Sequence, residues 1–191
     1  MSGIEQFEVP PEVVAAHEAG HAVVALACGI PVDWVEVRTY RPTATTKRFG
    51  WTEALENHWM ESSPLPHHAK ILRRVLLKAG GLAGELVADV FDAERSRRGA
   101  MDDIGQMGAG LVELSLLAST ADGTLPEFVK AVLPHAVKLI ERDAPAFHAL
   151  RQRLINDGRV DRPTMTVTWN VQDDGEFAAK LQEVKCLLKG P

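Results

Sequence analysis

The run His17-Glu18-Ala19-Gly20-His21 constrains this chain more than any other feature of its sequence. On a helix, residues four apart lie on one face, one turn apart, so His17 and His21 can direct two imidazoles at one metal ion. Zinc is the metal expected for such a pair when one coordination position stays open. Glu18 lies about 100° further round the helix. There it is beside the metal without being a ligand, and it can accept a proton from water.

The flanks of this run separate a metal helix from a chance match. Residues 11–16 and 22–27 are small and mostly apolar, which favours a buried helix over a solvated helix or a loop. The Pro10-Pro11 pair suits a helix start, and Gly29 suits a helix stop. We therefore predict a buried helix over residues 11–28 that carries a metal site.

Length and composition limit the class of protein. The 191 residues predict one domain with a small appendage, and a net charge of −5 argues against a nucleic-acid partner. No apolar segment is long enough to cross a membrane, and the N-terminus lacks the basic and apolar regions of a signal peptide. Cys28 and Cys186 form no disulfide framework, so we expect both to be reduced in a cytoplasmic protein.

The remaining chain reads as mainly helical, with few strands. Helical patterns cover residues 67–91, 102–119, 126–142, 143–158 and 176–189, and a charged loop is expected over 92–99. Within the first of these helices stand Gly80, Gly81 and Gly84, which cost about 1 kcal/mol each relative to alanine. Such residues are expected where another helix, such as the metal helix, packs closely.

Three segments are predicted as strands. Residues 33–40 are rich in β-branched and aromatic side chains, but polar residues fall on both faces, which favours an edge strand or a short ribbon. Gly50-Trp51-Thr52 is a second short strand. Residues 165–171 alternate as a third strand, followed by a turn at 173–175. The class is therefore α+β and mainly α-helical.

A catalytic zinc needs a third protein ligand. No histidine follows within the next helical turns, so the ligand has to come from farther along the chain. The acidic candidates are Glu85, Asp89, Asp102 and Asp103, and spacing alone does not choose among them.

Several blocks of the sequence resemble the FtsH-type zinc peptidase domain, the proteolytic half of membrane-anchored AAA+ proteases. They span about residues 10–165 in the family's order. The first block is His17 to Val23, which resembles the family's active-site helix, and the others are Gly50-Trp51-Thr52, Gly80 to Glu85, Gly99 to Ile104 and Leu154 to Asp161.

The resemblance implies a zincin-like peptidase domain over residues 1–165, with a strand-helix appendage over 166–191. It also implies that Asp103 is the third zinc ligand, 82 residues after His21 (103 − 21). Asp103 would lie in the first turn of a helix, where the dipole favours a carboxylate. Asp102, where the family has Asn, is expected to cap that helix or to hydrogen-bond a ligand. Glu85 is the fallback ligand, although it is more suited to orienting a histidine.

The function expected from this resemblance is a zinc-dependent peptidase with Glu18 as the general base. The chain has no phosphate-binding loop motif, so an ATPase half is not expected. The substrate would be a peptide or unfolded protein, and folded substrates would need a separate ATPase. It would lie along the edge strand by β-augmentation, at Val35, Val37, Gly50, Trp51 and Thr52.

Two alternatives to the peptidase stay open. One is a catalytically silent binding or regulatory module of the same fold, and the other is a metallohydrolase of a non-peptide amide. Besides the substrate, the partners that the sequence leaves open are a separate ATPase and further copies of the chain in a homo-oligomer.

Overall fold

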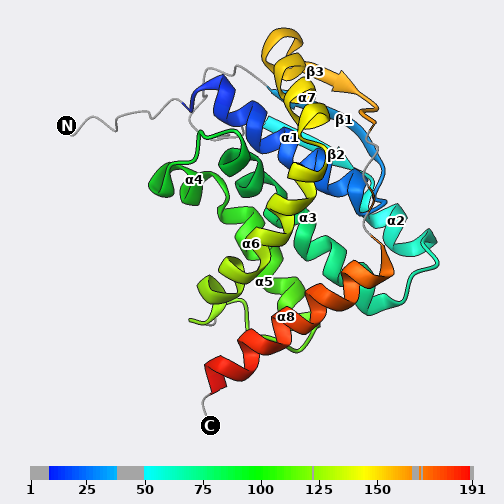
Figure 1. The fold of residues 1–191 in the computed structure, drawn as a ribbon, viewed down its shortest axis with the longest axis vertical. Coiled ribbons are helices and arrows are strands. Elements are labelled where there is room, and N and C mark those ends of the chain that lie inside the picture. Colours follow the sequence, from blue (N-terminus) through cyan, green and yellow to red (C-terminus); the bar gives the residue numbers. More distant parts are fainter. Residues whose placement is uncertain (1–8, 38–49, 122, 165–167, 169, 190–191) are drawn as a thin grey trace.

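The computed structural model describes residues 9–37, 50–121, 123–164, 168 and 170–189. They form a mainly helical fold with one small antiparallel sheet (Figure 1), so the predicted α+β, mainly α class is confirmed. The elements in chain order are α1 (Pro11–Ala27), β1 (Val32–Val37), β2 (Gly50–Ala54), α2 (Glu56–Ser62), α3 (His67–Val87), α4 (Ala93–Gly99), α5 (Met101–Glu113), α6 (Leu125–Arg142), α7 (Ala144–Asp157), β3 (Arg159–Asp161) and α8 (Val171–Lys189).

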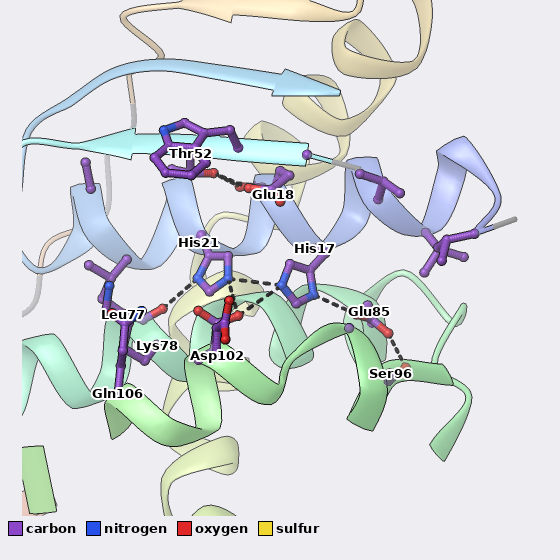
Figure 2. A pocket seen from close by; sticks show the side chains of 18 of the residues that line it. His17, Glu18, His21, Thr52, Leu77, Lys78, Glu85, Ser96, Asp102 and Gln106 are labelled. Atoms are coloured by element: carbon purple, nitrogen blue, oxygen red, sulfur yellow. Dashed lines mark hydrogen bonds and ion pairs between the residues drawn. The ribbon is translucent and has the colours of Figure 1, made fainter. Parts of the chain in front are cut away.

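Helix α1 is the central element of the fold. Thirteen of its 17 residues are buried, since it packs against the sheet on one side and against α3 on the other (Figure 2). It begins at Pro11 directly after Pro10 and ends before Gly29, whose φ of 77° stops the helix. The predicted buried helix is therefore confirmed, and its small side chains are what allow burial on every face.

The crossing of α1 and α3 is unusually close because glycines occupy it. A Cβ added to Gly20 would lie 2.1 Å from the carbonyl oxygen of Gly80, and one added to Gly84 would lie 2.2 Å from that of Ala16. The two backbones thus touch where any larger residue would separate them. The expectation that the glycines of residues 80–84 mark close packing against the metal helix is confirmed.

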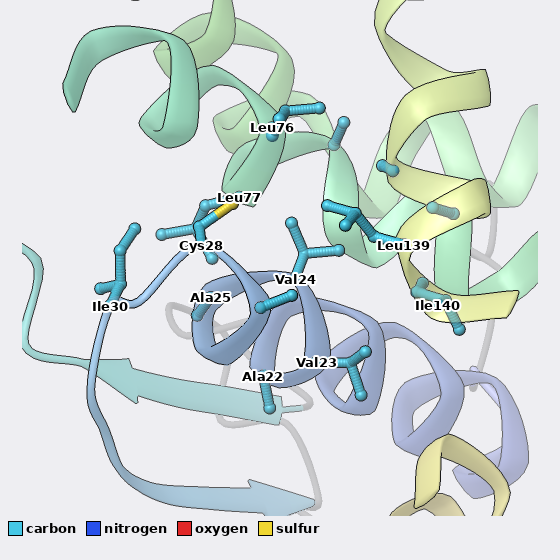
Figure 3. Close-up of a cluster of buried hydrophobic side chains, with 14 of the residues drawn as sticks. Ala22, Val23, Val24, Ala25, Cys28, Ile30, Leu76, Leu77, Leu139 and Ile140 are labelled. Carbon is cyan, nitrogen blue, oxygen red and sulfur yellow. The ribbon is translucent and has the colours of Figure 1, made fainter. Parts of the chain in front are cut away.

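Beyond this crossing, α1 and α3 share an apolar core with α6. Val24 of α1 faces Leu76 of α3 and Leu139 and Ile140 of α6, all with 0% relative exposure (Figure 3). Cys28 lies in the same core, and burial raises the pKa of its thiol to about 12. It behaves there as a small apolar residue, as the sequence predicted.

The prediction that residues 33–40 form an edge strand is wrong for the described part of that segment. Strand β1 is the middle strand of the order β2-β1-β3, and Val35 has Thr52 on one side and Val160 on the other. The sheet is buried on one face only. The polar residues of β1 therefore belong to its open face, where Arg159 lies over the Trp34 ring at 4.6 Å. Residues 38–40 lie outside the described residues.

The segment predicted as a charged loop over 92–99 instead contains helix α4. Asp92 is its N-cap, because its carboxylate accepts a hydrogen bond from the backbone N–H of Arg95 at 2.9 Å. The hydroxyl of Ser96 accepts the backbone N–H of Asp92 in return. These caps stabilise a short helix in a segment whose charged composition led to the loop prediction.

The C-terminal helix begins earlier than predicted, so the turn at 173–175 is wrong. The side chain of Asn170 accepts the backbone N–H of Asp173, and the carboxylate of Asp173 accepts the backbone N–H of Asn170. This reciprocal capping starts α8 at Val171 and keeps Gly175 inside the helix. Of the predicted strand at 165–171, residues 165–167 and 169 lie outside the described residues.

A buried ion pair fixes α8 to the rest of the fold. Arg73 of α3 donates to both carboxylate oxygens of Asp174, at 3.0 and 2.8 Å, and to the carbonyl of Cys28 at 3.0 Å. All polar groups of the pair are thereby satisfied by short, directed bonds. Among the described residues, no helix is long and apolar enough to span a membrane.

We predict that Gly84→Ala destabilises the protein by about 1–3 kcal/mol, because its Cβ would meet a backbone oxygen that cannot move alone. The matched control is Gly175→Ala, in the interior of α8, where a Cβ would meet nothing within 4 Å. Alanine should stabilise that position by about 0.5–1 kcal/mol. Urea unfolding of both variants tests the pair, and equal effects would contradict the close crossing.

Candidate metal centre

Three side chains from two helices converge at one point beside α1. The Nε2 atoms of His17 and His21 lie 3.1 Å apart, and the Oδ2 atom of Asp103 lies 3.3 and 3.2 Å from them. The histidines come from α1 and Asp103 from the first turn of α5, where the helix dipole favours a carboxylate. Figure 2 shows both imidazoles on the side of α1 that faces α3 and α5.

The size of this triangle is that of a tetrahedral zinc site. Ligand atoms bound at about 2.0–2.1 Å in a tetrahedron are separated by about 3.3 Å along each edge. The three observed edges of 3.1, 3.2 and 3.3 Å agree with that spacing. Two nitrogens and one carboxylate oxygen also form a donor set that zinc accepts, with a fourth position left for water.

Hydrogen bonds on the other ring nitrogens orient both imidazoles. The Nδ1–H of His21 donates to the carbonyl of Leu77 at 2.8 Å, and the Nδ1–H of His17 donates to Oε1 of Glu85 at 2.7 Å. Since a carbonyl oxygen can only accept, His21 carries its proton on Nδ1. In the neutral rings both Nε2 lone pairs therefore point at the same spot as the Asp103 carboxylate. Three electron-rich atoms this close together repel one another unless a proton or a metal ion compensates them, so the group could hold a metal ion.

The other acidic candidates do not reach this triangle. Glu85 is buried, with one oxygen on His17 and the other accepting the hydroxyl of Ser96. It orients a histidine, as the sequence suggested. Asp89 is exposed beyond the end of α3, and Asp102 is exposed at the cleft without being the cap of α5, which is Ala100.

A missing side chain on α3 makes room for the two imidazoles. A Cβ at Gly81 would lie 2.3 Å from His17 Nε2 and 2.6 Å from His21 Nε2. Gly81 stands midway between Leu77 and Glu85, four residues from each, on the face of α3 that meets the histidines. The same face therefore supplies the clearance and both orienting acceptors.

Glu18 lies on a different side of α1 from the histidines. Its carboxylate accepts the hydroxyl of Thr52 at 2.8 Å, and Figure 2 shows it turned toward β2. A Cβ at Gly50 would lie 2.6 Å from Glu18 Oε1, so a larger residue there would displace the carboxylate from its observed position. Glu18 thus borders the same cleft as the triangle without belonging to it.

At the centre, the charges of neighbouring residues shift the pKa values of His17 and Asp103. Burial lowers the pKa of His17, but hydrogen bonds to Asp103 and Glu85 and the charge of Glu18 outweigh burial and raise this pKa to about 10. For Asp103 the directions are reversed. Burial raises its pKa, but the charge of His21 and hydrogen bonds from both histidines outweigh burial and hold this pKa far below its usual range. Without a metal, the centre binds a proton tightly on His17, and a metal ion has to displace that proton in order to bind.

The cleft at the centre has a volume of about 340 Å³. Of the residues predicted to contact substrate, Gly50, Trp51 and Thr52 line it. Val35 and Val37 do not, since both are buried beneath the sheet.

Apart from Glu85, sequence reasoning missed the residues that support the centre. Ser96 was hidden in a segment predicted as a loop, and the Leu77 carbonyl carries no sequence signal at all. Thr52 was predicted only to contact substrate, and its hydroxyl donates a hydrogen bond to the Glu18 carboxylate.

Comparison with known proteins adds no assignment, because neither the known protein families nor the curated proteins contain a match to this chain.

We predict that Asp103→Asn lowers zinc affinity by more than the roughly 10–100-fold typical of losing an outer hydrogen-bond partner. Asp102→Asn, one residue away and also at the cleft, is the matched control and should leave the affinity nearly unchanged. Glu85→Gln should fall between them. Competition with a chromogenic chelator measures all three. If Glu85→Gln strips the metal while Asp103→Asn retains it, the ligand set is wrong.

The stability of the metal-free protein and the stabilisation gained on adding zinc should change with pH in opposite directions. The metal-free protein holds a proton on His17 up to a pH of about 10, whereas the unfolded chain releases it near 6.5. Its stability should therefore fall as the pH rises from about 6.5 to 10. Zinc displaces this proton, so the increase in Tm on adding zinc should grow over the same range. Thermal melts from pH 6.5 to 9 test this, and an increase independent of pH would contradict it.

Proposed function

We propose that this chain is a zinc-dependent peptidase that hydrolyses peptides or unstructured protein segments without an ATPase of its own. The observation that carries the proposal is that one cleft contains a group of possible metal ligands and, apart from it, a carboxylate that could act as a general base. Three ligand atoms form a triangle of zinc dimensions, and a fourth group, the Glu18 carboxylate, is held apart from them by Thr52. A purely structural zinc site would be closed by a fourth protein ligand instead.

A zinc ion held by His17, His21 and Asp103 would supply Lewis acidity, which polarises a carbonyl and lowers the pKa of water. The chain's own residues do the rest. Glu18 accepts a proton from the attacking water and passes it to the leaving amine. The Thr52 hydroxyl holds the Glu18 carboxylate facing the cleft, and Glu85 and the Leu77 carbonyl keep both imidazoles in the tautomer that exposes Nε2.

Strand β2 replaces β1 as the proposed substrate edge. Its pairing with β1 uses one edge, and among the described residues no strand pairs with the other. Gly50, Trp51 and Thr52 of β2 line the cleft next to Glu18. An extended peptide added at this edge would pass the centre and form main-chain hydrogen bonds of the β-augmentation type.

The zincin-like fold and the FtsH-type family, which the sequence blocks resemble, belong to this proposal. So do a cytoplasmic location, a separate ATPase for folded substrates and assembly into a homo-oligomer. The geometry supports the family's ligand set, because Asp103 and not Glu85 completes the triangle.

We predict that Glu18→Gln lowers hydrolysis of an unfolded protein such as casein by about 10²-fold or more, because positioned proton transfer contributes about 10²–10⁴. Zinc content and folding should stay nearly unchanged, since Glu18 is not a ligand. The matched control is Glu12→Gln, on the exposed first turn of the same helix, which should retain activity.

Two results would contradict the peptidase. Full activity of Glu18→Gln would mean that the base is elsewhere. A wild-type protein that hydrolyses nothing, yet binds peptides equally with and without zinc, would instead be a silent binding module.

A further inference from the structure

Among the side chains that the structure describes, two cationic ones line the cleft, at opposite ends of the candidate metal centre. Lys78 follows Leu77 on α3, at the end beside His21 (Figure 2). Arg95 directly precedes Ser96 on α4, and Figure 2 shows Ser96 at the other end, beside Glu85 and His17. The charge of each depends on what pairs with it.

The charge of Lys78 is already compensated within the protein. Its Nζ lies 2.9 Å from Glu56 Oε2, and both partners are largely buried. This carboxylate also pairs with Arg74 at 2.6 Å. A substrate anion at this end would have to compete with Glu56, so Lys78 is a weak candidate for binding one.

The charge of Arg95 is not compensated by any carboxylate of the described residues. One terminal nitrogen, Nη2, donates to the carbonyl of Val90 at 2.5 Å, which fixes the side chain but leaves its charge unpaired. Its Nε is closed off from solvent and has no hydrogen-bond partner. An unsatisfied buried donor of a charged group is costly. Its other terminal nitrogen, Nη1, is neither hydrogen-bonded to a described residue nor closed off from solvent, so this nitrogen can receive an anion at the cleft wall.

We propose that Arg95 binds a carboxylate of the peptide substrate, so that the enzyme prefers peptides with an anionic group on the α4 side of the scissile bond. The guanidinium is planar and presents several donors in a fixed fork, which matches a carboxylate. The carboxylate belongs either to an acidic side chain or to the C-terminus of the peptide. This inference rests on the proposed peptidase function and specifies its substrate class.

The test uses the zinc-loaded full chain and fluorescein-labelled alanine hexapeptides. One set carries a single Glu or a single Gln at each position in turn, and each peptide is made with a free or an amidated C-terminus. Binding is measured by fluorescence anisotropy, with intact peptide verified by mass spectrometry, and kcat/KM is measured for peptides that are cut. Wild type should prefer a carboxylate peptide over its neutral partner by about tenfold or more, as expected for a hydrogen bond between charged groups.

Arg95→Gln should reduce this preference to about twofold or less. Lys78→Gln is the matched control, because it removes the same charge from the same cleft, and it should keep the preference. A preference lost on amidation identifies the C-terminus as the ligand, and one lost on changing Glu to Gln identifies the side chain. A preference that survives in Arg95→Gln would come from the zinc and would overturn the inference.

Wild type alone also tests the inference, so it does not depend on the folding of the variant. Equal binding of carboxylate and neutral peptides, or no binding of any carboxylate peptide, overturns it. The proposed function fails separately. If no peptide is hydrolysed but binding still depends on Arg95, the peptidase is wrong and the carboxylate site stands. If peptides are hydrolysed without dependence on Arg95, only the inference fails.

Discussion

The candidate metal centre depends on how closely α1 and α3 approach each other. Gly20, Gly80 and Gly84 let the two backbones touch, and the antiparallel crossing aligns one face of α3 with the histidines of α1. On that face, Leu77, Gly81 and Glu85 recur every four residues and supply an acceptor, an empty space and a second acceptor. A wider crossing would break both hydrogen bonds and leave the imidazoles free to rotate.

The two sides of α1 separate the proposed metal ligands from the proposed general base. The histidines face α3 and α5, where Asp103 completes the triangle, while Glu18 faces β2 and is held by Thr52. Because Glu18 is one residue from His17, a helix turns it about 100° away, far enough to keep it out of the ligand set. It remains close enough for its charge to raise the pKa of His17. One helix thus presents both groups to the same cleft.

Local patterns predicted the long helices, which have a clear apolar pattern or a proline start, and failed where strand pairing or side-chain capping decided the structure. Helices α1, α3, α6 and α7 lie where periodicity and proline placed them. Strand β1 was predicted as an edge strand because its polar residues suggested that both faces are exposed to solvent. In a sheet that is buried on one face only, however, a middle strand also has one exposed face. The starts of α4 and α8 depend on side-chain caps at Asp92 and Asn170, which hydrophobic periodicity does not register.

The sequence by itself determined that two imidazoles share a helical face with a carboxylate beside them, because i,i+4 geometry is local to α1. It also restricted the third ligand to a few acidic residues, and the family resemblance singled out Asp103. Only the tertiary structure decided that Asp103 completes the centre, that Glu85 orients His17, and that β2 rather than β1 borders the cleft. These contacts join residues 34 to 86 positions apart. Packing between elements sets such distances, and no local spacing in the chain encodes them.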